Sequence, residues 1–179
     1  ALARTIEVLR EIAPDVKIFI QLNHAGRKAS TDPVTGTPMK PLQGGWGTLA
    51  PSAIPFAEGW PTPKELLPNE CEAIIDAFAS AAQRAVRAGV DGIMVHAAHG
   101  YLIHEFLSPL SNLRIDEYGG AIDGRTRFGL NVLHRVKLSV PNNIAVGVRV
   151  SATDWVDEGL QVEDVIEFLN KAKVHGLDF

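Results

Sequence analysis

Two histidines and a tyrosine are the residues whose types and spacing point most directly to chemistry. His96 and His99 lie three positions apart, and Gly100 permits a tight backbone turn before Tyr101. Two imidazole N–H groups directed at one oxygen would polarise a conjugated carbonyl compound and stabilise the enolate that forms when hydride adds to it. A tyrosine, whose unperturbed pKa is about 10, can then protonate the enolate carbon. The pattern therefore indicates a carbonyl-binding site with its own proton donor.

Two other interpretations of these histidines stay open at this point. Paired histidines near the end of a strand can be hydrogen-bonded core residues, and the spacing alone does not decide. A zinc site that uses His96, His99 and His104 is the other functional alternative. It lacks a well-spaced carboxylate ligand, because Glu105 is adjacent to His104. Ligand chemistry therefore makes zinc the weaker of the two functional interpretations.

Two more polar residues interrupt or end apolar runs. Arg149 lies inside the apolar run 144–150. A buried guanidinium needs a partner, because an unpaired buried charge is costly. Arg149 is therefore expected either to form a structural ion pair or to bind an anion or an electron-rich ring. Gln21 lies near the end of the run 16–22 and can donate and accept hydrogen bonds at the edge of such a ring.

The single cysteine and the densest charge cluster are expected to have structural roles. Cys71 lies on the apolar stripe of an expected helix, which is typical of a small core residue and not of a reactive thiol. The charge cluster occupies an expected loop and reads as a hydrogen-bonded brace. Its members are Arg114, Asp116, Arg125 and Arg127.

Helices and strands must alternate to bring the candidate groups together. The expected strands are short apolar runs at residues 16–22, 90–95 and 144–150. The expected helices have apolar residues at helical spacing and cover residues 2–12, 68–88, 128–138 and 162–175. This alternation predicts βαβ units around a parallel sheet, either a barrel or a doubly wound sheet. In both, functional groups gather at the carboxyl ends of the strands, where the candidates lie.

Two further features of the sequence bear on the choice of fold. No glycine fingerprint follows any expected strand, so a dinucleotide-binding Rossmann unit has little support. Residues 26–63 are rich in Gly, Pro, Ser and Thr and are too long for an ordinary turn. Loops of that length usually serve as functional lids or carry small hairpins.

Composition narrows the class of protein. A hydrophobic share of 46% is ample for one core, and the net charge of -4 comes from scattered charges of both signs. No basic stripe suggests nucleic acid, and no polybasic amphipathic helix suggests a membrane surface. A single cysteine fits a reducing compartment. We therefore expect a cytoplasmic protein that acts on a small molecule, without nucleic-acid or membrane partners.

Four stretches resemble the Old Yellow Enzyme family of NADH:flavin oxidoreductases, in its bacterial branch of YqjM-type NADPH dehydrogenases and xenobiotic reductases. Residues 96–109 (HAAHGYLIHEFLSP) and 110–120 carry the most specific part, and residues 21–28 and 49–54 are similar to the preceding unit. The resemblance implies an α/β (β/α)8 TIM barrel. This chain is expected to cover roughly its middle half, with residues 1–179 forming a partial FMN-binding domain truncated at both ends.

The resemblance also implies a role for each candidate residue. Gln21 would hydrogen-bond the isoalloxazine of FMN, and Arg149 would stabilise the anionic reduced flavin near N1 and the C2 oxygen. His96 and His99 would bind the substrate carbonyl, and Tyr101 would donate a proton. No metal is implied. Ala121, Gly124 and Ile115 depart from the family's usual Ser, Asn and Thr, so the brace in that loop is expected to differ.

The implied activity is that of an ene-reductase with ping-pong kinetics. NAD(P)H would reduce FMN and leave, and an α,β-unsaturated carbonyl compound would receive hydride from flavin N5 and a proton from Tyr101. The alternatives are a dienoyl-CoA reductase or an amine-oxidising relative on the same barrel, or a metal-dependent hydrolase barrel that uses the histidines. Enzymes of this branch are often homo-oligomers, so a homo-oligomer is also expected.

Overall fold

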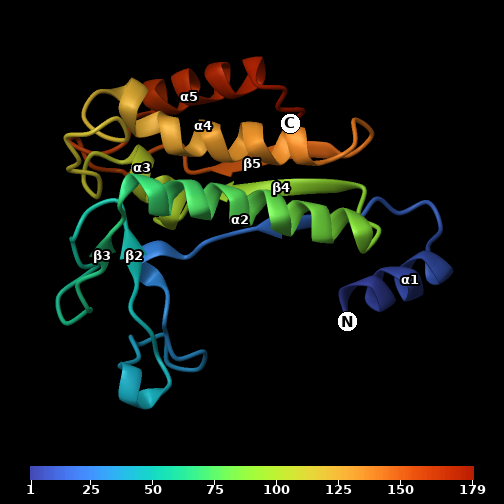
Figure 1. Ribbon diagram of the computed structural model, residues 1–179, viewed down its shortest axis with the longest axis horizontal. Coiled ribbons are helices and arrows are strands. Elements are labelled where there is room, and N and C mark those ends of the chain that lie inside the picture. Colours follow the sequence, from blue (N-terminus) through green and yellow to red (C-terminus); the bar gives the residue numbers. More distant parts are fainter.

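A three-stranded parallel sheet organises the chain, and the computed structural model describes residues 1–179 (Figure 1). The strands in spatial order are β1 (Phe19–Leu22), β4 (Gly92–Ala97) and β5 (Ala145–Val150). The helices that follow them in the chain are α2 (Pro68–Arg87), α4 (Ile122–Ser139) and α5 (Val162–Val174). The predicted βαβ units are confirmed, with boundaries that differ by a few residues.

The remaining elements are short or lie at the start of the chain. They are α1 (Leu2–Ile12), the 3-10 turns η1 (Gly26–Lys28) and η2 (Pro41–Gln43), β2 (Leu49–Ala50), β3 (Lys64–Glu65) and α3 (Leu102–Leu107). The long loop after β1 carries an isolated antiparallel bridge between Thr31 and Pro38. The six residues of α3 were not predicted, because so short a helix shows no clear periodicity. No helix combines the length and the apolar character needed to cross a membrane.

The two faces of the sheet have different environments. α2, α4 and α5 lie side by side along one face (Figure 1). Alternate residues of the strands, such as Ile93, Val95 and Val146, are fully buried on this side in one apolar core. Cys71 belongs to the same core, and burial raises the pKa of its thiol to about 11, which confirms its structural role.

The opposite face of the sheet is aromatic at one end and polar at the other. The Phe19 ring covers Gly92, where an added Cβ would lie 2.1 Å from the ring. The Phe179 ring covers Gly147 in the same way and meets Phe19 edge-on at 5.4 Å. The Val148 amide donates to the Phe179 carbonyl oxygen at 3.1 Å, so the last residues lie beside β5.

The structure confirms that the charge cluster forms a hydrogen-bonded brace. Arg114 is 6% exposed, and its guanidinium donates to the carbonyl oxygens of Pro51 and Leu66 at 2.9 and 2.6 Å and pairs with Asp116. It thereby ties the loop after α3 to the segment before α2. The two other arginines of the cluster bond backbone oxygens, namely Arg125 to Leu107 and Arg127 to Glu117.

A buried carboxyl group on α3 holds the loop after β1. Glu105 is fully buried, and its Oε1 accepts the backbone N–H of Arg27 at 2.9 Å. Gly26 has a φ of +60°, and an added Cβ there would lie 2.2 Å from the same carboxylate. Only glycine therefore fits against Glu105 at this position. Burial raises the pKa of Glu105 to about 8, because the few hydrogen bonds and charges around it do not offset the loss of water.

The core predicts a large difference between two positions on α4. Phe128 is fully buried and stacks on Phe106 at 4.1 Å, whereas Leu138 on the same helix is 70% exposed. We expect Phe128→Ala to lower the free energy of unfolding by about 3–5 kcal/mol, because it leaves a cavity. Leu138→Ala should change it by less than about 0.5 kcal/mol. Urea titration measures both; equal losses would contradict this packing.

The buried carboxyl predicts a pH dependence of stability. Folded Glu105 keeps its proton up to a pH of about 8, whereas the unfolded chain loses it near 4.5. Between these values the folded state binds more protons, so its stability falls as pH rises, by at most about 1.4 kcal/mol per pH unit. Glu105→Gln keeps the acceptor oxygen and should remove this slope.

The control for this measurement is Glu117→Gln, at an exposed position. The free energy of unfolding is measured by urea titration at several pH values between about 5 and 8. The control should keep the slope of the unmodified protein. If Glu105→Gln also kept it, Glu105 would be ionised in the folded state.

Candidate functional site

The register of the sheet brings the predicted polar residues to one edge of one face. His96 on β4 lies directly opposite Arg149 on β5. Gln21 on β1 lies opposite Met94, two residues before His96 and therefore on the same face. All of them lie near the carboxyl ends of the strands, on the face that the helices do not cover. The structure thus brings Gln21, His96 and Arg149 together as the sequence predicted.

His96, His99 and Tyr101 form a cluster of rings at the end of β4. The ring centroids of His96 and His99 are 5.0 Å apart, and those of His96 and Tyr101 are 5.2 Å apart. His96 is buried, yet its Nδ1 has no hydrogen-bond partner. Burial, and then the nearby charges of His99 and Arg149, lower the pKa of His96, so its imidazole is neutral at pH 7. Buried polar atoms rarely lack a partner, and those that do are often found at functional sites.

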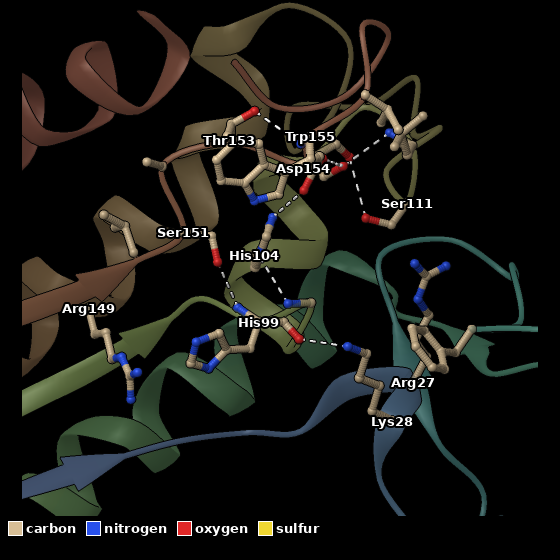
Figure 2. A pocket seen from close by; sticks show the side chains of 17 residues that line it. Arg27, Lys28, His99, His104, Ser111, Arg149, Ser151, Thr153, Asp154 and Trp155 are labelled. Atoms are coloured by element: carbon tan, nitrogen blue, oxygen red, sulfur yellow. Dashed lines mark hydrogen bonds and ion pairs between the residues drawn. The ribbon is translucent and has the colours of Figure 1, made fainter. Parts of the chain in front are cut away.

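His99 lies in a strained turn. His99 and Gly100 both have left-handed backbone conformations, with φ of +59° and +66°. For a residue other than glycine this conformation costs about 1–3 kcal/mol and persists only where the surroundings hold it. The ring of His99 is exposed beside the cavity described below (Figure 2).

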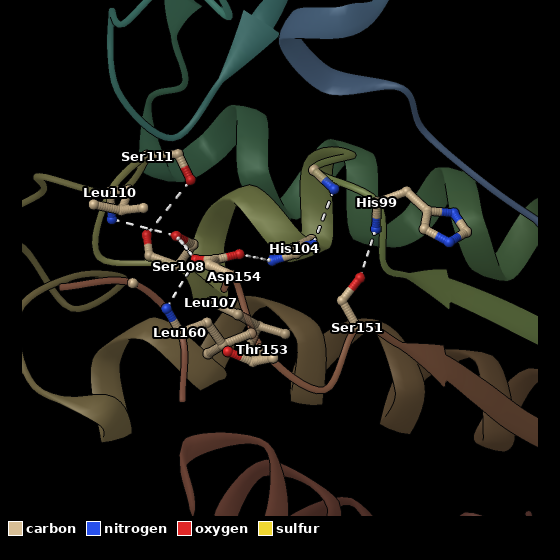
Figure 3. Close-up of polar contacts among 12 residues, drawn as sticks. His99, His104, Leu107, Ser108, Leu110, Ser111, Ser151, Thr153, Asp154 and Leu160 are labelled. Carbon is tan, nitrogen blue, oxygen red and sulfur yellow. Dashed lines mark hydrogen bonds and ion pairs between the residues drawn. The ribbon is translucent and has the colours of Figure 1, made fainter. Parts of the chain in front are cut away.

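A network of hydrogen bonds connects α3 with the loop after β5 (Figure 3). His104 Nε2 bonds Asp154 Oδ1 at 2.8 Å, and the other carboxylate oxygen accepts Ser108 Oγ at 2.6 Å and the Leu160 amide at 2.8 Å. Burial opposes ionisation of Asp154, but the hydrogen bonds from His104 and Ser108 outweigh it and lower the pKa to about 2. Asp154 is therefore ionised, and both of its carboxylate oxygens already accept hydrogen bonds from the protein.

The zinc interpretation of the histidines finds no support in this geometry. Both ring nitrogens of His104 are engaged, one by Asp154 and the other by the Gly100 N–H at 2.9 Å. No three His, Cys, Asp or Glu side chains lie together in an arrangement that could hold a metal ion. The histidines His96, His99 and His104 are thus not assembled as a zinc site.

The expectation that Arg149 is buried is wrong. Its side chain projects from the face of the sheet that no helix covers, so it is exposed and forms no ion pair (Figure 2). The alternative of a structural ion pair therefore has no support. Arg149 instead lines a cavity of about 720 Å³ between the carboxyl ends of the three strands.

The cavity also contains residues that the sequence analysis did not single out. Arg27 and Lys28 line it from the loop after β1, and Lys28 Nζ lies 4.2 Å from the centre of the Phe56 ring. Burial and the neighbouring Arg27 lower the pKa of Lys28. Ser151 and Asp154 line it from the loop after β5. All four lie in loops that follow strands, and Arg27 and Lys28 also belong to the stretch 21–28 that resembles the family.

The predicted residues are divided between this cavity and the open face of the sheet. His99 and Arg149 line the cavity. Gln21, His96 and Tyr101 lie beside it and are not part of its lining. The site is therefore wider than the cavity and extends over the face that carries Gln21.

Several curated relatives with similar sequences are named NADPH dehydrogenase. An NADPH dehydrogenase of Clostridium acetobutylicum is 47% identical over 158 residues, which are 88% of this chain and 43% of that protein. An NADPH dehydrogenase of Bacillus subtilis is 46% identical over 162 residues, or 90% of this chain and 44% of that protein. The chain spans less than half the length of these relatives.

Solved structures with the same fold extend this similarity. An old yellow enzyme homologue from Zymomonas mobilis has a TM-score of 0.79 and 26% identity, and the alignment covers 99% of this chain and 50% of that one. Histamine dehydrogenase from a Rhizobium species has a TM-score of 0.76 and 29% identity over 94% of this chain and 23% of that one. These neighbours confirm the TIM-barrel prediction over the doubly wound alternative. With the family model matching residues 5–179, the chain belongs to the NADH:flavin oxidoreductase / NADH oxidase family, of the Old Yellow Enzyme type.

Proposed function

We propose that this protein is an FMN-dependent oxidoreductase that uses NAD(P)H to reduce the activated C=C bond of α,β-unsaturated carbonyl compounds. The observation that carries the proposal is the cluster of His96, His99 and Tyr101 at the end of β4, beside the exposed Arg149 and Gln21. Membership of the flavin oxidoreductase family and relatives named NADPH dehydrogenase support it.

The residues present fit a flavin. The face that carries Gln21, His96 and Arg149 is not covered by helices, and it offers an exposed amide and an unpaired guanidinium beside the buried His96 ring, whose Nδ1 has no partner. Gln21 would hydrogen-bond the edge of the isoalloxazine, and Arg149 would stabilise negative charge near N1 and the C2 oxygen. When bound, FMN accepts hydride from NAD(P)H and supplies it to the β-carbon of the substrate.

The two histidines would bind the substrate oxygen. Their ring centroids are 5.0 Å apart, so one carbonyl oxygen between them can accept a hydrogen bond from each ring. Negative charge grows on this oxygen as hydride adds, and donors held in place before the reaction stabilise that charge. Because its pKa is lowered, His96 acts as a neutral donor and does not add a second positive charge beside Arg149.

Tyr101 would supply the proton. Its ring lies 5.2 Å from His96 on the turn that also carries His99, so a substrate held by both histidines would have the phenol beside it. The hydroxyl would protonate the α-carbon as the enolate collapses. Catalysis is therefore proposed to divide between oxygen binding by the histidines and proton donation by the tyrosine.

The charge of the cavity bears on the alternative substrates. Arg27, Lys28 and Arg149 line it, whereas its one carboxylate, Asp154, is already bonded to His104 and Ser108. A cationic lining repels a protonated amine and attracts phosphates. An acyl-CoA thioester, the class of compound after which the structurally similar 2-naphthoyl-CoA reductase is named, is therefore a better second candidate than an amine.

A visible absorption spectrum tests the proposal first. The purified full-length protein should show bound flavin absorbance that bleaches when NADPH is added without oxygen and returns with cyclohexenone. A full-length protein that neither contains nor binds FMN would overturn the proposed function. Bound flavin that NADPH reduces but no enone reoxidises would favour the acyl-CoA alternative, for which a dienoyl-CoA is the next substrate to add.

Substitution of the proposed proton donor separates the two half-reactions. Tyr101→Phe should slow enone reduction by about 100-fold or more, since general acid catalysis typically contributes this much. Flavin reduction by NAD(P)H should remain near the unmodified rate, because it needs no proton on carbon. Stopped-flow absorbance measures both steps, and equal losses in the two would show that Tyr101 is not a specific proton donor.

A further inference from the structure

We infer that Ser151 and His104 are positioning residues, which hold the strained His99–Gly100 turn so that the His99 ring faces His96. The inference rests on the proposed function, because it assigns these two residues to the binding of the substrate oxygen through His99. Neither side chain needs to touch substrate or flavin.

Side chains from three separate segments hold the backbone of the turn. The His99 N–H donates to Ser151 Oγ at 3.0 Å, and the Gly100 N–H donates to His104 Nδ1 at 2.9 Å (Figures 2 and 3). Lys28 Nζ donates to the His99 carbonyl oxygen at 2.7 Å. Consecutive left-handed residues leave these groups without helix or sheet partners, so the side chains replace the missing bonds.

The hydrogen bond from Gly100 determines the tautomer of His104. Because an N–H group donates to Nδ1, that nitrogen carries no hydrogen, and the hydrogen of the neutral ring is on Nε2. Nε2 then donates to Asp154, whose second oxygen is held by Ser108 and the Leu160 amide. His104 is thus held at both ring nitrogens and presents a fixed acceptor to the turn.

The loop after β5 therefore reaches the turn by two routes. Ser151 bonds it directly, and Asp154, three residues further on, bonds it through His104. Arg149 precedes Ser151 by two residues on the same segment. One short stretch of chain thus positions both the guanidinium proposed for the flavin and the histidine proposed for the substrate. Ser151 is half-buried and lies outside the apolar core, whereas His104 is buried, so the Ser151 variants are the milder test.

Ligand binding to the FMN-loaded full-length protein tests the inference. The probe is 4-hydroxybenzaldehyde, whose phenolate resembles the enolate oxygen, and its Kd is read from the change in flavin absorbance. Ser151→Ala should raise this Kd by about five- to ten-fold, because one hydrogen bond of the turn is lost. Ser151→Thr keeps the hydroxyl and should restore most of the affinity.

A second pair of variants examines the other route. His104→Ala removes the acceptor for the Gly100 N–H and should also raise the Kd, whereas His104→Asn offers an oxygen near the place of Nδ1 and should be less impaired. Ser139→Ala on α4 is the matched control, because Ser139 bonds only backbone oxygens of α2 and α4. It should leave the Kd unchanged.

The outcomes distinguish this inference from the proposed function. If His99→Ala does not weaken phenolate binding, the proposed role of His99 is wrong and the inference fails with it. If His99→Ala weakens binding but Ser151→Ala and His104→Ala bind as tightly as the unmodified protein, only the inference is overturned. A lower Tm with unchanged Kd in these two variants would likewise show that Ser151 and His104 have only a structural role.

Discussion

Parallel pairing of β4 with a strand on each side is the constraint on which the rest of the structure depends. The register sets His96 opposite Arg149 and places Gln21 on the same face, so residues far apart in the sequence meet at one edge. Alternation along each strand sends the branched apolar residues to α2 and α4 and leaves the polar ones on the other face. A slip of one residue would exchange the two faces.

The short helix α3 joins the three loops that follow the strands. Its neighbouring residues His104 and Glu105 bond in different directions, the first to Asp154 after β5 and the second to the Arg27 amide after β1. The loop after β4 leads directly into α3 and is bonded to it through Gly100. The loops that meet here have few regular backbone hydrogen bonds, and hydrogen bonds with buried side chains of α3 hold them in place instead. This explains how so short a helix can organise the site.

The side chains of the site carry mostly positive charge, which favours reactions in which negative charge develops. Arg27, Lys28 and Arg149 contribute positive charge, and both oxygens of the Asp154 carboxylate are already bonded, one to His104 and the other to Ser108. His96 stays neutral, since burial and nearby cations lower its pKa. An oxygen that gains negative charge during a reaction is therefore met by cations and neutral donors, without a free carboxylate to repel it.

The sequence by itself determined the alternation of strands and helices, the buried role of Cys71 and the polar residues at the strand ends, because periodicity and residue type act locally. It also carried the family motif around His96. Only the tertiary structure decided that Arg149 is exposed, that Glu105 holds Gly26 and Arg27, and that Ser151 and Asp154 reach the His99 turn. The hydrogen bonds among these features join residues 50 to 78 positions apart, and such contacts follow from strand order and register, which local patterns do not encode.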